Sequence, residues 1–152
     1  MSNANLLPSN RVALLDAIDP DANLAGTYVT SWISAKDFAN FKAIILTGVI
    51  GTNGTLDVRL RQATDSSGTG AKDITNKAIT QLTQTGDNDS DKQAIINCRS
   101  DELDIANGFD YIQLTMDVGT ETSDTCALLL GFDARYGIAS DYNASSVAEI
   151  VA

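Results

Sequence analysis

The stretch FKAIILTGVIGTNGTLDVRLRQ, from Phe41 to Gln62, decides the fold class. Its first ten residues, 41–50, are almost all apolar, which is typical of a strand in the middle of a sheet. In its second half apolar and charged residues alternate: Leu56, Asp57, Val58, Arg59, Leu60 and Arg61. Between the two halves, Asn53-Gly54 favours a tight turn because both residues tolerate positive φ. The stretch therefore predicts a β-hairpin over residues 41–62.

Strand patterns continue on both sides of this stretch. The clearest is Phe109–Val118, where every second residue is apolar and one face is expected to be buried. The other candidate strands are Arg11–Ile18, Gly26–Ile33, Ile74–Leu82, Gln93–Arg99 and Thr125–Phe132. Polar turns separate them, and no stretch has a helical apolar period over three turns. These patterns predict an all-β protein, an antiparallel β-sandwich or jelly-roll-like fold of about eight strands with extended terminal arms.

The chain divides into one domain and two flanking segments. We expect an N-terminal arm at 1–10, a β-sandwich domain at 11–135 and a C-terminal tail at 136–152. Apolar residues in or beside the flanking segments have no evident place in an autonomous core, and we expect them to form an interface: Leu6, Leu7, Val12, Val147, Ile150 and Val151. The flanking segments either add to a neighbouring subunit or pack back on their own sandwich, and the sequence leaves both open.

The composition excludes several classes of function. Ten Lys and Arg against 20 Asp and Glu give a formal charge of −10, which repels nucleic acid. No apolar run approaches the roughly 20 residues that a membrane helix needs. The first residues lack the positive region of a secretory signal, so we expect synthesis in the cytoplasm. We expect neither nucleic acid nor a membrane as a partner.

The chain has no histidine, which removes most constellations that carry hydrolytic or zinc chemistry. No glycine-rich loop that could hold a nucleotide phosphate follows a strand. The single tryptophan, Trp32, is expected in the core or an interface rather than as a sugar platform. We therefore expect no enzymatic activity, no catalytic residue and no cofactor.

Two further features have alternatives that stay open. Asp87, Asp89 and Asp91 have the spacing that begins a calcium loop, but Lys92 and Cys98 stand where an EF-hand needs glycine and glutamate. We expect an exposed acidic loop and no metal site, with a looser calcium site as the alternative. Cys98 and Cys126 are expected to be buried small hydrophobic residues, with a disulfide between them as the alternative.

Several short runs resemble a group of small virion proteins of tailed bacteriophages. They are QATD (62–65), GTGAKDI (68–74), KAITQL (77–82), ELD (102–104), GF (108–109), GFDARY (131–136) and VAEIV (147–151). Together they cover roughly residue 56 to the end of the sequence, and none of them is a catalytic signature. The resemblance therefore implies a lineage and a context rather than a reaction.

Among virion components, the resemblance best implies a head decoration or cement protein on the capsid surface. Such a protein binds the shell of the major capsid protein, stabilises it and self-associates, with a homotrimer expected. The alternatives are a tail, head–tail connector or fibre-base protein and, less favoured, a small carbohydrate-binding β-sandwich. The number of copies per particle separates the first two, and glycan binding tests the third.

Overall fold

The computed structural model describes residues 6–152, and every regular element in that range is a strand or a short 3₁₀ helix. The strands are β1 (Val12–Asn23), β2 (Gly26–Val29), β3 (Ile33–Ser34), β4 (Phe38–Ile50), β5 (Thr55–Ala63), β6 (Lys72–Ala78), β7 (Leu82–Thr83), β8 (Gln93–Arg99), β9 (Tyr111–Gly119) and β10 (Ser123–Ala134). The 3₁₀ helices are η1 (Pro8–Asn10), η2 (Ser100–Glu102), η3 (Ile105–Asn107) and η4 (Ala139–Tyr142). None of the helices in the described range is long and apolar enough to span a membrane.

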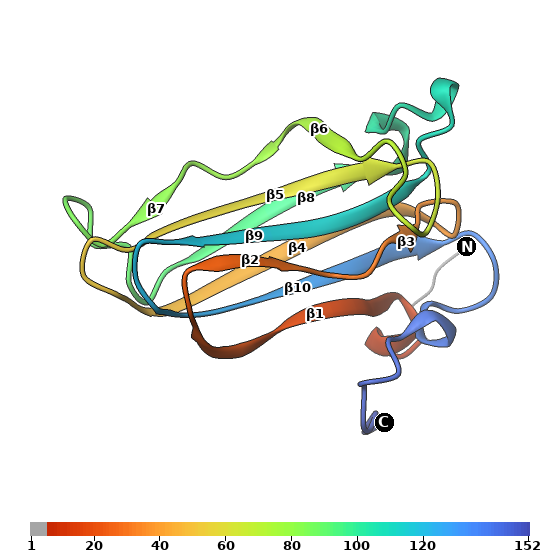
Figure 1. The fold of residues 1–152 in the computed structure, drawn as a ribbon. Helices are drawn as coiled ribbons and strands as arrows, with labels where there is room; N and C mark the ends of the chain where they lie inside the picture. The colour runs from red at the N-terminus through yellow and green to blue at the C-terminus, as the bar shows by residue number, and fades with distance from the viewer. Residues whose placement is uncertain (1–5) are drawn as a thin grey trace.

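The strands form two antiparallel sheets that pack face to face (Figure 1). One sheet has four strands in the order β1-β10-β4-β8. The other has the order β2-β9-β5-β6, with β3 beside β9 and β7 beside β5. Most connections cross from one sheet to the other, which is the winding of a jelly roll. The predicted all-β antiparallel sandwich is confirmed, with ten strands instead of about eight, two of them only two residues long.

The predicted hairpin over residues 41–62 is wrong in its pairing, although both strands are present. β4 lies in the four-stranded sheet and pairs with β10 and β8, whereas β5 lies in the other sheet and pairs with β9. Asn53 has the expected positive φ of 61°. However, residues 51–54 all belong to the connection, which is long enough to cross the roughly 10 Å between packed sheets. Facing each other across the core, the two strands each bury an apolar face.

The core lies between the two sheets and follows the alternation in the sequence. In the six-stranded sheet β5 and β9 lie side by side and bury every second residue: Leu56, Val58, Leu60, Ile112, Leu114, Met116 and Val118. The buried residues of the four-stranded sheet that pack against them are Ala13, Phe41, Ala43, Ile45, Ala127 and Leu129. Each large apolar side chain buried here contributes about 1.5–3 kcal/mol.

Two predicted strands are interrupted in the structure. Ile74–Leu82 becomes β6 and β7, and the left-handed backbone at Asn76 (φ 60°) accompanies a register shift between β6 and β5. Gly26–Ile33 becomes β2 and β3, with Trp32 in the connection. The Trp32 ring lies half-buried against Gly68, where an added Cβ would approach the indole nitrogen to 2.5 Å. Only glycine fits at this close approach, which also has a positive φ of 82°.

The first part of the segment after β10, up to residue 144, packs against the sandwich. Ala139 is fully buried, and the Tyr142 ring packs edge-on against Phe38 with ring centres 5.1 Å apart. Ala144 N–H then donates a hydrogen bond to the Leu14 carbonyl (2.8 Å) on the edge of β1. Ordered packing therefore continues to residue 144, beyond the domain limit of 135 set from the sequence.

Candidate interaction surface

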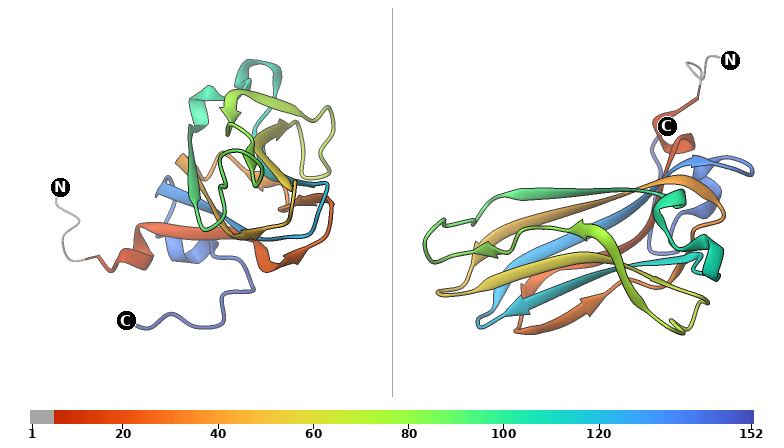
Figure 2. Two further views of the ribbon diagram at one scale, coloured as in Figure 1. Left: turned by 90° about the vertical axis from the view of Figure 1, so that its left-hand side faces the viewer. Right: turned by 90° about the horizontal axis from the view of Figure 1, so that it is seen from above.

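The outward-facing side chains of the four-stranded sheet are mostly apolar. Successive strand residues point to opposite sides of a sheet, so the neighbours of the core residues face outward. We call these residues the outer face: Val12, Leu14, Ala17, Ile44, Leu46, Ile95, Cys126, Leu128, Leu130 and Phe132. No third layer of strands covers them (Figure 2).

The outer face is continuous across all four strands. Ile44 on β4 lies between Leu128 on β10 and Ile95 on β8. Leu130 pairs with Leu14 on β1 in the same way. Side chains directly opposite on neighbouring strands lie close enough to contact, so these residues form one band. Ile95 keeps 57% of its surface exposed and Leu46 keeps 36%, whereas the other members of the outer face are half-buried. An apolar area that stays in contact with solvent is typical of an interaction site.

Unlike the outer face of the four-stranded sheet, the outward side of the six-stranded sheet carries charged side chains. There Arg59 binds both Asp117 and Asp73, and Arg61 also binds Asp73 (3.2 Å). Burial raises the pKa of Asp117, but hydrogen bonds from Arg59 and Thr27 outweigh it, so the pKa lies below its usual range. Since only one of the two outward sides is apolar, the outer face is a specific feature of the four-stranded sheet.

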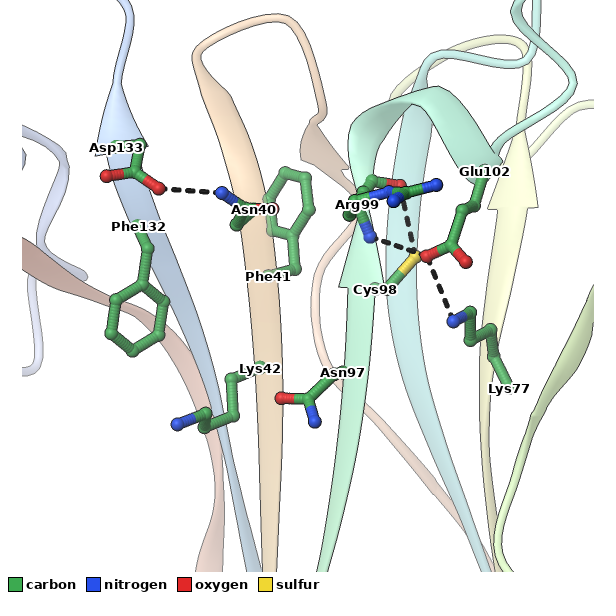
Figure 3. Close-up of a pocket in the computed structure, with 10 residues that line it drawn as sticks. All are labelled: Asn40, Phe41, Lys42, Lys77, Asn97, Cys98, Arg99, Glu102, Phe132 and Asp133. Carbon is green, nitrogen blue, oxygen red and sulfur yellow. Dashed lines mark hydrogen bonds and ion pairs between the residues drawn. The ribbon is translucent and has the colours of Figure 1, made fainter.

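Polar groups border the outer face toward the end where β8 finishes (Figure 3). The Lys42 ammonium lies 5.2 Å from the centre of the Phe132 ring, and Asn40 Nδ2 donates to Asp133 (2.6 Å). A hollow of about 490 Å³ runs here past the edge of β8; its lining includes Asn97, Cys98, Arg99, Lys77 and Glu102. The hollow holds charged groups of both signs and room for a peptide segment.

The six residues expected to form an interface lie in three places. Val12 is part of the outer face, paired with Phe132. Leu6 and Leu7 precede η1 and are exposed; residues 1–5 of the predicted arm lie outside the described part of the chain. Val147 is half-buried, whereas Ile150 and Val151 are exposed. Both terminal segments leave one end of the sandwich on the side of the outer face (Figure 2).

Most of the outer face was not singled out from the sequence. The sequence predicts that residues 41–50 form a strand in the middle of a sheet, and it also contains the unbroken apolar run 128–130. In an antiparallel sandwich a central strand still turns one side outward, so an unbroken apolar run makes both of its sides apolar. Leu129 is fully buried, while Leu128 and Leu130 face outward. The unbroken runs were the signal that could have revealed the outer face.

The carboxylate of Asp89 fixes the conformation of the acidic loop at 87–91 through hydrogen bonds. Asp89 was expected to be exposed, but it is buried. Its carboxylate accepts hydrogen bonds from Lys92 Nζ (2.8 Å) and from Thr83 N–H (2.9 Å). These contacts hold the pKa of Asp89 below its usual range, the bond from Lys92 having the larger effect. Within residues 6–152, no group of three or more acidic or cysteine side chains is placed to hold a metal ion.

We expect Asp89 to make the stability of the fold depend on pH. Its folded pKa lies below the unfolded value of 3.8, so its contribution is complete above about pH 5 and is lost as pH falls through the folded pKa. The variant Asp89→Asn cannot titrate. At pH 7 its melting temperature should lie roughly 2 °C below that of the wild type, and the gap should shrink steadily as pH falls below about 4. Thermal melts across this range measure the difference in melting temperature.

The control is Asp87→Asn, in the same loop, which should match the wild type. A difference for Asp89→Asn that does not change with pH would contradict the assignment.

The two cysteines are free thiols in different surroundings. Cys98 is buried as expected, and burial raises the pKa of its thiol to about 11. Cys126 lies on the outer face and is only partly buried, which differs from the expected core position. The structure therefore shows no disulfide between Cys98 and Cys126.

Comparison with known proteins adds a likeness in fold only. No protein-family model and no curated protein sequence matches the chain. A chain in the cryo-EM structure of Broad Bean Stain Virus is 10% identical, with coverage of 91% of this chain and 92% of that one and a TM-score of 0.46. A chain of the Cowpea mosaic virus top component, from naturally occurring empty particles, is 11% identical over 84% of each chain, with a TM-score of 0.42.

The similar structures are not restricted to viruses. The xylan-binding module CBM15 is 8% identical, with coverage of 86% of this chain and 96% of that one and a TM-score of 0.39. The chain is thus similar in its jelly-roll arrangement of strands to proteins of virus particles and to a xylan-binding module alike. Because the TM-scores are below 0.5, this likeness gives no information about the function of the chain.

Proposed function

We propose that the chain is a non-enzymatic structural protein of a tailed-phage virion, and that it decorates the capsid and stabilises it by binding the major capsid protein. The observation that carries the proposal is the continuous apolar outer face of the four-stranded sheet. The short runs that resemble tailed-phage virion proteins supply the context. The partner is then the shell, and the outer face is the surface that meets it.

The size of the outer face suits a stable contact. Association costs about 4–15 kcal/mol in lost freedom of motion, and burying one large apolar side chain returns about 1.5–3 kcal/mol. Several such side chains must therefore be buried together. The outer face offers eight large ones: Val12, Leu14, Ile44, Leu46, Ile95, Leu128, Leu130 and Phe132. A typical interface buries about 800 Å² on each partner.

The charge of the chain favours a position with the outer face toward the shell and the rest toward solvent. The charged side chains beside the outer face have both signs: Lys42 and Arg99 are basic, and Asp124 and Asp133 on β10 are acidic. Acidic residues dominate the remainder of a chain with a net charge of −10. Such a surface repels DNA and suits the outside of a capsid.

The terminal segments extend the same footprint. Leu6, Leu7, Ile150 and Val151 are exposed, and both segments project on the side of the outer face (Figure 2). Segments of this kind gain contact area by ordering on a partner. We therefore assign them to the contact with neighbouring virion subunits.

The experiment compares particles of the phage that encodes the chain, made with and without its gene. We expect on the order of hundreds of copies per complete particle by quantitative mass spectrometry, as a symmetric shell requires. Particles without the chain should release their DNA at a lower temperature, and adding the purified chain should restore the loss. About six or twelve copies would instead support a tail or connector protein. Absence from purified particles would overturn the proposal.

A further inference from the structure

One edge of the sandwich, β8, has no strand of the described chain paired to its outer side, and only at its end do Glu102 and Lys77, which form an ion pair, cover it. Proteins shield exposed edges with bulges, proline, very short strands or a covering segment. β1 has two register shifts and Pro20, and residues 143–144 cover it at Leu14. β2 has four residues, and β6 has a register shift and the left-handed Asn76. β8 pairs with β4 over seven consecutive positions without a shift, and no strand of the described chain pairs with its other side.

The free hydrogen-bonding groups of β8 can be assigned to residues. The Lys92 carbonyl accepts from Thr47 N–H (3.0 Å), so Lys92 points toward β4. In an antiparallel ladder such residues alternate with residues whose N–H and C=O point away. Arg99 N–H accordingly donates away from β4, to Glu102 (2.7 Å). The N–H and C=O groups of Gln93, Ile95 and Asn97 therefore point outward along this edge.

The C-terminal arm, residues 145–152, has the composition of a strand that lacks a partner. It follows the bond from Ala144 to Leu14 and forms no strand of its own. Val151 keeps 84% of its surface exposed and Ile150 keeps 47%. Eight residues span about 26 Å when extended, which matches the seven residues of β8.

The arm cannot pair with β8 of its own chain. It departs from the edge of β1, and β8 is the opposite edge of the order β1-β10-β4-β8. A position beyond β8 is five strand spacings away from Ala144, about 24 Å, and crossing that distance uses about seven residues. Only about one residue of the segment 145–152 would remain for pairing. The occupant that fits is the arm of a second copy.

We propose that the C-terminal arm of one copy adds as an antiparallel fifth strand along β8 of a second copy. The main chain supplies the hydrogen bonds, as in other cases of strand addition. This contact joins copies of the chain, so it goes beyond the docking of one copy on a shell. It does not depend on that docking.

One register satisfies both charge and packing. With Glu149 opposite Asn97, the only charged side chain of residues 145–152 lies diagonal to Arg99, the only charged side chain of β8. Val151 then lies opposite the exposed Ile95. On the other side of the new strand Ile150 meets Ile96, and the small Ala148 meets Cys98. The hollow of about 490 Å³ beside Asn97, Cys98 and Arg99 gives the arm space at this edge (Figure 3).

The contact is heterologous, because an arm binds an edge and the two are different surfaces. Such contacts form closed rings when the rotation between copies suits and open chains otherwise. Each copy has one arm and one edge, so each can join two neighbours.

The test uses the full chain and two variants that each remove one half of the contact. Asn97→Pro removes an outward N–H and leaves the bonds between β4 and β8 intact. A chain ending at Ala144 lacks the arm. Analytical ultracentrifugation at about 100 µM should show oligomers for the wild type and monomers for each variant. An equimolar mixture of the two variants should form a 1:1 complex, because one supplies the arm and the other the edge. Asn97→Ala, which keeps the N–H, should associate within about threefold of the wild type.

Several results would overturn the inference. One is a monomeric wild type, and another is an arm-deleted chain that keeps the wild-type oligomer. A mixture of the variants that stays monomeric would do the same, provided that circular dichroism shows both folded. If Asn97→Pro does not fold, Ile95→Asp takes its place, because its carboxylate would lie diagonal to Glu149 and opposite the apolar Val151 in the paired register. Oligomers that persist in that variant would also refute the contact.

Discussion

Replacing Leu128 by aspartate should weaken binding of the chain to its particle at least 100-fold and leave the sandwich folded. Leu128 lies in the middle of the outer face, between Ala17 on β1 and Ile44 on β4. A carboxylate at this point would be buried without a partner in the contact, which costs several kcal/mol. Each 1.4 kcal/mol is a tenfold change in affinity. In the free chain the position is partly open to water, so the melting temperature should change little.

The matched control is the next residue in the chain. Leu129 lies on the opposite side of β10 and is fully buried. Leu129→Ala should lower the free energy of unfolding by about 2–5 kcal/mol, while the folded variant binds as the wild type does. Co-sedimentation with particles and chemical denaturation measure the two effects. Unchanged binding of Leu128→Asp would show that the outer face is not the docking surface.

Phe38→Ala should be the most destabilising single substitution of those considered, at about 3–5 kcal/mol. Phe38 is 1% exposed, and its ring packs edge-on against both Phe41 and Tyr142. It also covers Gly131, where an added Cβ would lie 2.8 Å from the ring. Removing the ring leaves a cavity at the end of the sandwich that the neighbouring strands cannot close.

The same substitution should release the segment that precedes the C-terminal arm. Tyr142 loses its ring contact, so the bond from Ala144 N–H to Leu14 should open more often. Hydrogen exchange at Ala144 should accelerate more than exchange in β9, whose inward residues are fully buried. Urea denaturation gives the stability. Phe132→Ala, on the outer face of the same sheet, should cost under about 1.5 kcal/mol. Equal losses for the two variants would contradict the role given to Phe38.

The sequence predicted the strands better than it predicted their partners. Period-two alternation located β5 and β9 and named their buried residues, because alternation depends only on neighbours along the chain. The hairpin over residues 41–62 failed, since a turn signal does not say whether the next strand lies beside the last one or across the core. The role of Asp89 was missed for a similar reason: Thr83 and Lys92 come together only in the folded loop.

Local pattern was sufficient for an all-β body, for its alternating core and for apolar terminal segments that the core does not absorb. The order of strands in the two sheets, the outer face and the open edge of β8 are consequences of packing. The physical reason is that alternation marks which residues share a side of a strand, whereas only contacts between distant segments decide whether that side meets the core or the solvent. Ile44 and Ile45 are adjacent and have the same side chain, yet Ile45 is fully buried in the core and Ile44 lies on the outer face.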